Sequence, residues 1–135
     1  MKKTIRQILK VLTFPYSPEL SVLLVSDRKM KGLNLRYRRI KKVTDVLSFP
    51  SREDISQNLH SVGSFGPEVL GDIVISLPCV QQQARERGIT IYEELNNILI
   101  HSILHLCGYS HESVYKLRRM RLKEKEIASS LRSSQ

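Results

Sequence analysis

The sequence lacks the features of a membrane-spanning, exported or disulfide-stabilised protein. No apolar run approaches the roughly 20 residues that a helix needs to cross a bilayer. The charged residues after Met1 are not followed by a long apolar segment with a small-residue cleavage site, so we expect no signal peptide. Two cysteines, Cys79 and Cys107, are too few for a disulfide framework. We therefore expect a cytoplasmic protein with no membrane partner.

The length and the hydrophobic pattern predict one small α+β domain. A chain of 135 residues with 41% hydrophobic residues can form a single core, so we expect one domain over residues 1–135. Apolar spacing and turn residues predict helices over 3–12, 27–37, 77–87, 91–106 and 112–130, and strands over 20–26, 43–50 and 69–76. This order predicts a single small mixed sheet of three or four strands, packed by about five helices.

The sequence also predicts a long loop, a frayed tail and the buried face of the last helix. The segment 51–68 is rich in serine and glycine, so we expect a long loop. The residues from Ser129 to Gln135 are expected to form a frayed tail. The last helix is expected to turn its apolar residues toward the core, namely Val114, Leu117, Met120 and Ile127.

The positive charge is concentrated in two segments of the chain. The net charge is +9, and residues 28–42 alone hold eight lysines and arginines. A second basic group extends from Lys116 to Lys125, whereas residues 53–112 are nearly neutral to acidic. Uneven basic charge in a small domain indicates a polyanionic partner, most often a nucleic acid. The alternative is a solvated basic face that only aids solubility.

Three of the four histidines lie within the segment 100–111, with the spacing H-x3-H-x5-H. If residues 91–106 are helical, His101 and His105 lie one turn apart on the same face. Gly108 can adopt the left-handed conformation that ends a helix, and the chain can then bring His111 to the same point. Three neutral imidazoles are the ligand set of a catalytic zinc with an open fourth position. We therefore predict one Zn²⁺ per chain, at the end of a buried central helix.

Other interpretations of these residues remain open. The histidines could be partly buried helix residues, or the site could be a closed structural zinc with Cys107 as its fourth ligand. However, Cys107 lies two residues after His105 and points off the face that carries the histidines, so we interpret it as a core thiol. Ser102 stands where the metalloprotease motif H-E-x-x-H has its glutamate base, which makes a zinc peptidase a weaker hypothesis. Glu112 is either a base or second carboxylate for the site, or a capping or exposed residue.

Four motifs resemble the YbeY-type bacterial endoribonucleases, a family of metal-dependent proteins of ribosomal RNA maturation. The segment Leu33–Arg38 is similar to L-N-x-x-Y-R of the family, and Thr44–Pro50 matches T-D-V-L-S-F-P. The segment Leu70–Ser76 resembles L-G-D-I-x-I-S, and His101–His111 resembles H-G-x-L-H-L-x-G-Y-D-H. Here Ser102 replaces the usual glycine, and Ser110 replaces an aspartate that could support the third ligand, a loss that could lower metal affinity about 10–100-fold.

The resemblance implies a function and a set of site residues. It implies that His101, His105 and His111 bind zinc and that Arg38 faces the metal across a basic cleft. The implied activity is cleavage of single-stranded RNA, with roles in 3′-end processing of small-subunit rRNA and in ribosome quality control. We expect Arg38 to be catalytic as a phosphate clamp, because a guanidinium can hold two phosphate oxygens. The candidate substrate-binding residues are Arg36, Arg39, Lys41, Lys42 and Ser48.

Two other function classes compete with the RNase. A different zinc hydrolase would act on peptides or small substrates and would be indifferent to Arg38. A non-catalytic protein that binds rRNA or the ribosome would hold a structural zinc and show no turnover. The sequence does not distinguish attack by zinc-bound hydroxide from attack by the RNA 2′-hydroxyl. It also does not give the oligomeric state.

Overall fold

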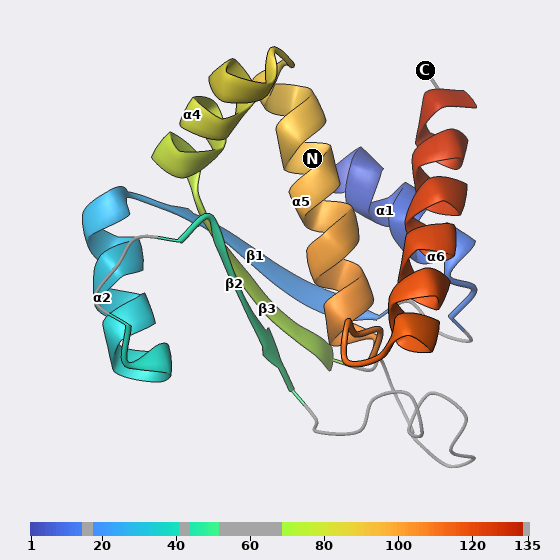
Figure 1. Cartoon of the computed structure of the whole chain (residues 1–135), viewed down its shortest axis with the longest axis horizontal. Helices are drawn as coiled ribbons and strands as arrows, with labels where there is room; N and C mark the ends of the chain where they lie inside the picture. Colours follow the sequence, from blue (N-terminus) through green and yellow to red (C-terminus); the bar gives the residue numbers. More distant parts are fainter. Residues whose placement is uncertain (15–17, 41–43, 52–68, 134–135) are drawn as a thin grey trace.

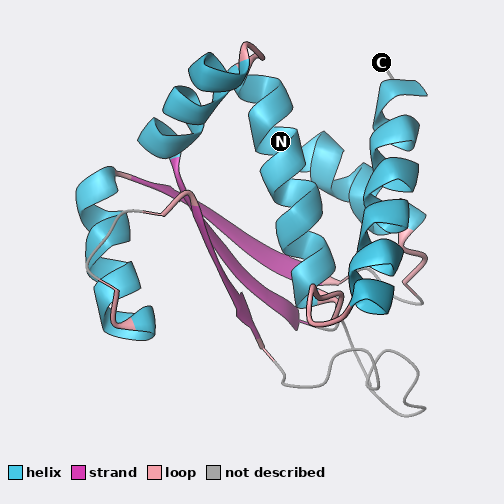
Figure 2. Cartoon of the chain, in the orientation of Figure 1, coloured by secondary structure: helices cyan, strands magenta, loops and turns pink. Residues whose placement is uncertain are grey.

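A computed structural model of the chain describes residues 1–14, 18–40, 44–51 and 69–133. Within these ranges, five helices and three strands follow in the predicted order (Figures 1 and 2). They are α1 (Lys2–Val11), β1 (Glu19–Val25), α2 (Asp27–Arg38), β2 (Val46–Pro50), β3 (Val69–Ser76), α4 (Leu77–Arg87), α5 (Ile91–Leu106) and α6 (Val114–Ser133). The predicted loop over 51–68 lies, apart from Ser51, outside the described residues. None of the described helices is both long enough and apolar enough to cross a membrane.

The three strands form one mixed sheet in the order β1-β3-β2, which confirms the predicted α+β class. Strand β3 lies in the centre, pairing parallel with β1 and antiparallel with β2. Gly71 in β3 has φ 144°, a conformation that side chains rarely allow. A Cβ atom at this position would clash with the backbone carbonyl oxygen of Phe49 on β2. The glycine therefore lets β2 approach the central strand.

Two apolar clusters lie on opposite faces of the sheet. Successive residues of β3 alternate between them, so Ile73 and Ile75 join the larger cluster while Val74 joins the smaller one. The larger cluster is built around α5, which is packed between the sheet and the helices α1 and α6 (Figure 1). Helix α2 covers the other face through Met30. Helix α5 is thus the predicted buried central helix, and its carboxyl end lies beside β2 and the start of α6.

The boundaries of α6 differ from the prediction. The helix continues to Ser133, because Leu131 is buried against the core and holds the last turns in place. Val114 was expected to face inward but is 74% exposed. At about 100° per residue, Val114 lies about 120° around the helix from Met120, which is fully buried. The buried face is therefore set by Met120, Ile127 and Leu131, and the first turn of α6 projects beyond the core.

Candidate metal centre

The carboxyl end of α5 turns back on itself at Gly108, as its sequence predicts. Gly108 has φ 95°, and its N–H donates to the carbonyl of His105 at 3.0 Å. The N–H of Tyr109 donates to the carbonyl of Leu104, also at 3.0 Å. This pair of hydrogen bonds is a Schellman motif, which satisfies carbonyls that the helix end would otherwise leave unpaired. The turn reverses the chain and places His111 beside the last turns of α5.

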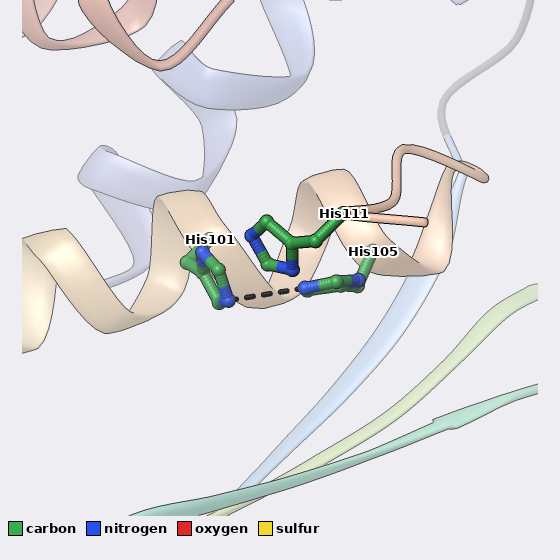
Figure 3. Close-up of side chains that lie close together, drawn as sticks. All are labelled: His101, His105 and His111. Carbon is green, nitrogen blue, oxygen red and sulfur yellow. Dashed lines mark hydrogen bonds between the residues drawn. The ribbon is translucent and has the colours of Figure 1, made fainter. Parts of the chain in front are cut away.

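The structure brings the three predicted histidines together (Figure 3). The Nε2 atoms of His101 and His105 lie 3.0 Å apart, and one ligand nitrogen from each of the three rings lies within 4.8 Å of the others. Two nitrogens bound to one tetrahedral zinc lie about 3.3 Å apart. The His111 ring reaches over the other two from the 108–111 turn, with its centroid 5.2 Å from that of His101 and 5.0 Å from that of His105. The three rings therefore fit a shared metal ion.

The surroundings of His105 favour its neutral, metal-binding form. Burial lowers the pKa of His105, and the neighbouring charges of His101 and His111 lower it further. The Nδ1 atom of His101 lies 3.3 Å from the Oε1 atom of Glu124 on α6. Metal-binding histidines commonly donate their second ring N–H to such a carboxylate, which leaves the other nitrogen free for the metal. The ring nitrogens thus fit a metal ion, and the carboxylate of Glu124 is placed to support one of the ligands, His101.

The histidines line one wall of a cavity of about 730 Å³. The end of α2 and the segment 44–50, which includes β2, also line this cavity. Arg38, Ser48 and Asp45 all line this cavity, together with Tyr37. The Tyr37 ring packs edge-on against Phe49 with the centroids 5.1 Å apart, which joins the end of α2 to β2. We call this space the histidine cavity.

Of the other candidate substrate-binding residues, Arg36 and Arg39 are described and do not line the histidine cavity. The Arg36 guanidinium lies over the Tyr37 ring, 5.4 Å from its centroid. Arg39 ends α2 in the left-handed conformation with φ 55° and is exposed. Lys41 and Lys42 lie outside the described residues. Of the predicted phosphate-binding residues, the structure therefore places Arg38 and Ser48 with the histidines.

The sequence did not indicate Glu124 and left the role of Glu112 open. Glu124 follows His101 by 23 positions, and no local motif marks it as its partner. Glu112, which was a candidate base beside His111, is exposed and pairs with Lys116 at 3.1 Å. Of the two alternatives for Glu112, the structure therefore supports an exposed surface residue. The rotation of α6 about its own axis, which its buried residues determine, would have indicated that Glu124 faces His101.

Cys107 does not belong to the metal cluster. Within the described part of the chain, the cluster holds the three histidines and no fourth ligand. Cys107 is 7% exposed and packs in the larger apolar cluster, as predicted for a core thiol. Burial raises its pKa to about 12, so the thiol stays protonated near neutral pH. Because zinc binds the thiolate, this environment disfavours Cys107 as a ligand.

Comparison with known proteins gives one consistent result. The family model described as Endoribonuclease YbeY matches residues 1–132. The Endoribonuclease YbeY of Geobacillus thermodenitrificans is 37% identical over 127 residues, which cover 94% of this chain and 81% of that protein. The one from Thermodesulfovibrio yellowstonii is 39% identical, covering 97% and 88%. The solution structure of TM1509 from Thermotoga maritima matches with a TM-score of 0.61 at 30% identity, over 98% of this chain and 82% of that one.

Proposed function

This chain belongs to the family of the endoribonuclease YbeY, and on that premise we propose that it is a zinc-dependent endoribonuclease that cleaves single-stranded RNA. The observation that carries the proposal is the histidine cavity itself. The three clustered histidines and Arg38 line the same cavity. A phosphodiester bound there would have both metal ligands and a fixed positive charge beside it.

His101, His105 and His111 would hold the metal. A zinc ion bound by three imidazoles supplies a Lewis acid and, at its open position, a water whose pKa is lowered to about 7. Two of the ligands are placed by α5, so little conformational freedom is lost when they bind. The third depends on the 108–111 turn, and the side chain of His111 is exposed. We therefore expect His111 to be the most weakly held of the three ligands.

Glu124 would act as a positioning residue for His101. Its carboxylate accepts the Nδ1–H of His101, and this fixes both the ring orientation and the tautomer that leaves Nε2 free. The interaction also connects α6 to the site. This chain has Ser110 where the family usually has an aspartate, and Ser110 accepts a weak hydrogen bond from the backbone of Glu112 at 3.5 Å. Glu124 is therefore the carboxylate that supports the ligand set in this chain.

Arg38 would bind the scissile phosphate. A guanidinium donates two parallel hydrogen bonds to phosphate oxygens and can stabilise the charge that develops on them in the transition state. Ser48 on β2 lines the same cavity and offers a hydroxyl donor to the neighbouring phosphate or ribose. Arg36, Arg39, Lys41 and Lys42 would contribute to the attraction of RNA toward the cavity rather than to the chemical step.

The biological substrate that we propose is ribosomal RNA. The family resemblance favours a role in 3′-end maturation of small-subunit rRNA and in ribosome quality control, which implies action in the cytoplasm with the small ribosomal subunit as partner. We propose that residues 1–135 act as one domain. The alternatives are weaker: a closed structural zinc would need a fourth ligand, and the described cluster offers three. A peptidase would need a glutamate at the position of Ser102.

One experiment tests this proposal. Purified protein is analysed for bound metal and incubated with single-stranded and double-stranded RNA, with His105→Ala alongside. We expect about one zinc per chain and cleavage of the single-stranded RNA, both lost in the variant. Products that first carry a 2′,3′-cyclic phosphate would identify the RNA 2′-hydroxyl as the nucleophile, whereas a simple phosphate would identify water. Cleavage that survives both metal removal and His105→Ala would refute a metal-dependent mechanism.

A further inference from the structure

A second cavity, of about 530 Å³, lies on the other side of the 108–111 turn and has no part in the mechanism above. We call it the α6 cavity. One wall is formed by the residues that follow α1, from Leu12 to Phe14. The floor is formed by residues 107–110 and the other wall by the first turns of α6. The cavity is open and its polar groups are mainly basic.

The α6 wall presents three cations on one helical face. Lys116, Arg119 and Lys123 are spaced by three and four residues, so their side chains lie above one another along α6. Arg119 forms no ion pair with any residue that the structure describes. Lys116 pairs with Glu112 at 3.1 Å and Lys123 with Glu126 at 3.0 Å. Both acidic partners are exposed, so these surface pairs are weak and an incoming anion can compete with them.

Two tyrosines accompany the central cation of this row. The Arg119 guanidinium lies 5.9 Å from the ring centroid of Tyr109 and 5.9 Å from that of Tyr115. Tyr115 is 69% exposed, whereas Tyr109 lines the cavity and packs against the core. Exposed aromatic rings beside a basic groove are what proteins use to stack the bases of single-stranded nucleic acid. A basic face that only aids solubility would need neither the aromatic rings nor the cavity.

The α6 cavity adjoins the histidine cavity. Ser110 lines the former and His111 lines the latter, so two consecutive residues separate the two spaces. We propose that the α6 cavity is a second RNA subsite, which binds the phosphates and bases of the strand that continues from the metal centre over the 110–111 turn. This inference rests on the proposed function, because it takes the histidine cavity as the place of cleavage.

The chemistry favours RNA over an acidic protein segment as the occupant. Phosphates would replace Glu112 and Glu126 on the lysines, and Arg119 can bind a phosphate while it remains between the two rings. An acidic peptide would use the cations but leave the exposed face of Tyr115 without a stacking partner. A strand that spans both cavities would also bind with stronger dependence on salt than one that reaches only the histidine cavity.

The test compares a short RNA of about four nucleotides with a long RNA of about twelve. The test variant is Arg119→Gln/Lys123→Gln, and the control is Arg118→Gln/Arg121→Gln. The control removes the same charge from exposed positions of α6 that line neither described cavity. We expect the ratio of kcat/KM for long over short RNA to fall about tenfold in the test variant and to stay near the wild-type value in the control. Tyr115→Leu should lower the same ratio less, since it removes stacking but no charge.

A binding measurement separates this inference from the proposed function. In a His105→Ala background, the dissociation constant of the long RNA is measured at several salt concentrations. The test variant should weaken binding about tenfold and reduce the slope against log salt by about 1.4, at about 0.7 per phosphate contact. If the test variant shows these binding losses but the wild-type protein cleaves no RNA, the subsite is supported and the nuclease is refuted. Turnover with an unchanged ratio and slope, or equal losses in the control, would refute the subsite alone.

Discussion

The molecule has two cavities that meet at the 110–111 turn, each lined by an arginine, and they differ in the groups that accompany that arginine. In the histidine cavity, Arg38 and Asp45 share the lining with the three histidines that could hold a metal ion. In the α6 cavity, Arg119 lies between two tyrosine rings. If both proposals hold, similar cations serve catalysis in one cavity and binding in the other, because only the histidine cavity offers metal ligands beside the arginine.

Removal of a metal ligand should have the largest effect, because it should abolish the function proposed for the histidine cavity and leave the α6 cavity intact. In His105→Ala, we expect metal content to fall from about one ion per chain to near zero and RNA cleavage to fall to background. Binding of long RNA should be retained in part, because the α6 cavity is untouched. His60→Ala is the matched control, since it removes the fourth histidine of the chain, which has no assigned role. Metal analysis and a cleavage assay on the same preparations check this prediction.

Removal of Arg38 should leave the metal in place and remove the charge that faces it. For Arg38→Ala, we expect kcat to fall about 10²–10³-fold with unchanged metal content, because an interaction with the transition state is lost. Arg36→Ala is the control: it removes the same charge two residues earlier on α2, from a side chain that lies over Tyr37 and does not line the cavity. Equal losses in the two variants would mean that α2 only attracts RNA.

The sequence predicted that three histidines come together, and the structure brings them together. The histidine cavity depends mainly on local signals, namely the one-turn spacing of His101 and His105 and a glycine that ends α5. These features act within a few residues, so a periodic pattern is enough to place them. Arg38 was assigned by resemblance, and it lines the same cavity as the histidines. The order of helices and strands followed from hydrophobic periodicity for the same reason.

What the sequence could not predict depends on the placement of α6 relative to the rest of the chain. The inward direction predicted for Val114 was wrong, because the contacts of α6 with α1 and α5 bury Met120 and Ile127 but leave Val114 exposed. The interaction of Glu124 with His101 and the α6 cavity depend on the same packing. A helix with basic residues on several faces gives no local sign of which face borders a cavity. Tertiary contacts supply that information.

Substitution of Glu124 tests whether α6 supports the metal ligands of the histidine cavity in addition to lining the α6 cavity. In Glu124→Gln, we expect zinc affinity to fall about 10–100-fold, since a neutral amide holds the Nδ1–H of His101 less strongly than a carboxylate does. With saturating zinc, kcat should recover most of its wild-type value. Competition with a chromophoric chelator measures the affinity without reference to activity. Glu126→Gln, on the same helix but paired with Lys123, should leave the affinity unchanged.

The smallest effect on the metal is expected at Cys107, which follows His105 by two residues but lines the other cavity. Because burial raises the pKa of its thiol to about 12, we expect no thiolate to be available to zinc near neutral pH. Cys107→Ala should therefore change zinc affinity less than about twofold while costing about 1 kcal/mol of folding free energy from lost packing. In the native protein, a thiol reagent should modify Cys79 well before Cys107, which is buried.

This last variant decides whether the two cavities are chemically separate. A large loss of zinc affinity in Cys107→Ala, with folding intact by circular dichroism, would mean that the thiol reaches the metal after a rearrangement of the 108–111 turn. The site would then be a closed one with four protein ligands, and the water-activating position would be gone. Unchanged affinity would leave three imidazoles with an open fourth position. Leu106 would then be the single residue between a metal ligand, His105, and a thiol of the apolar core, Cys107.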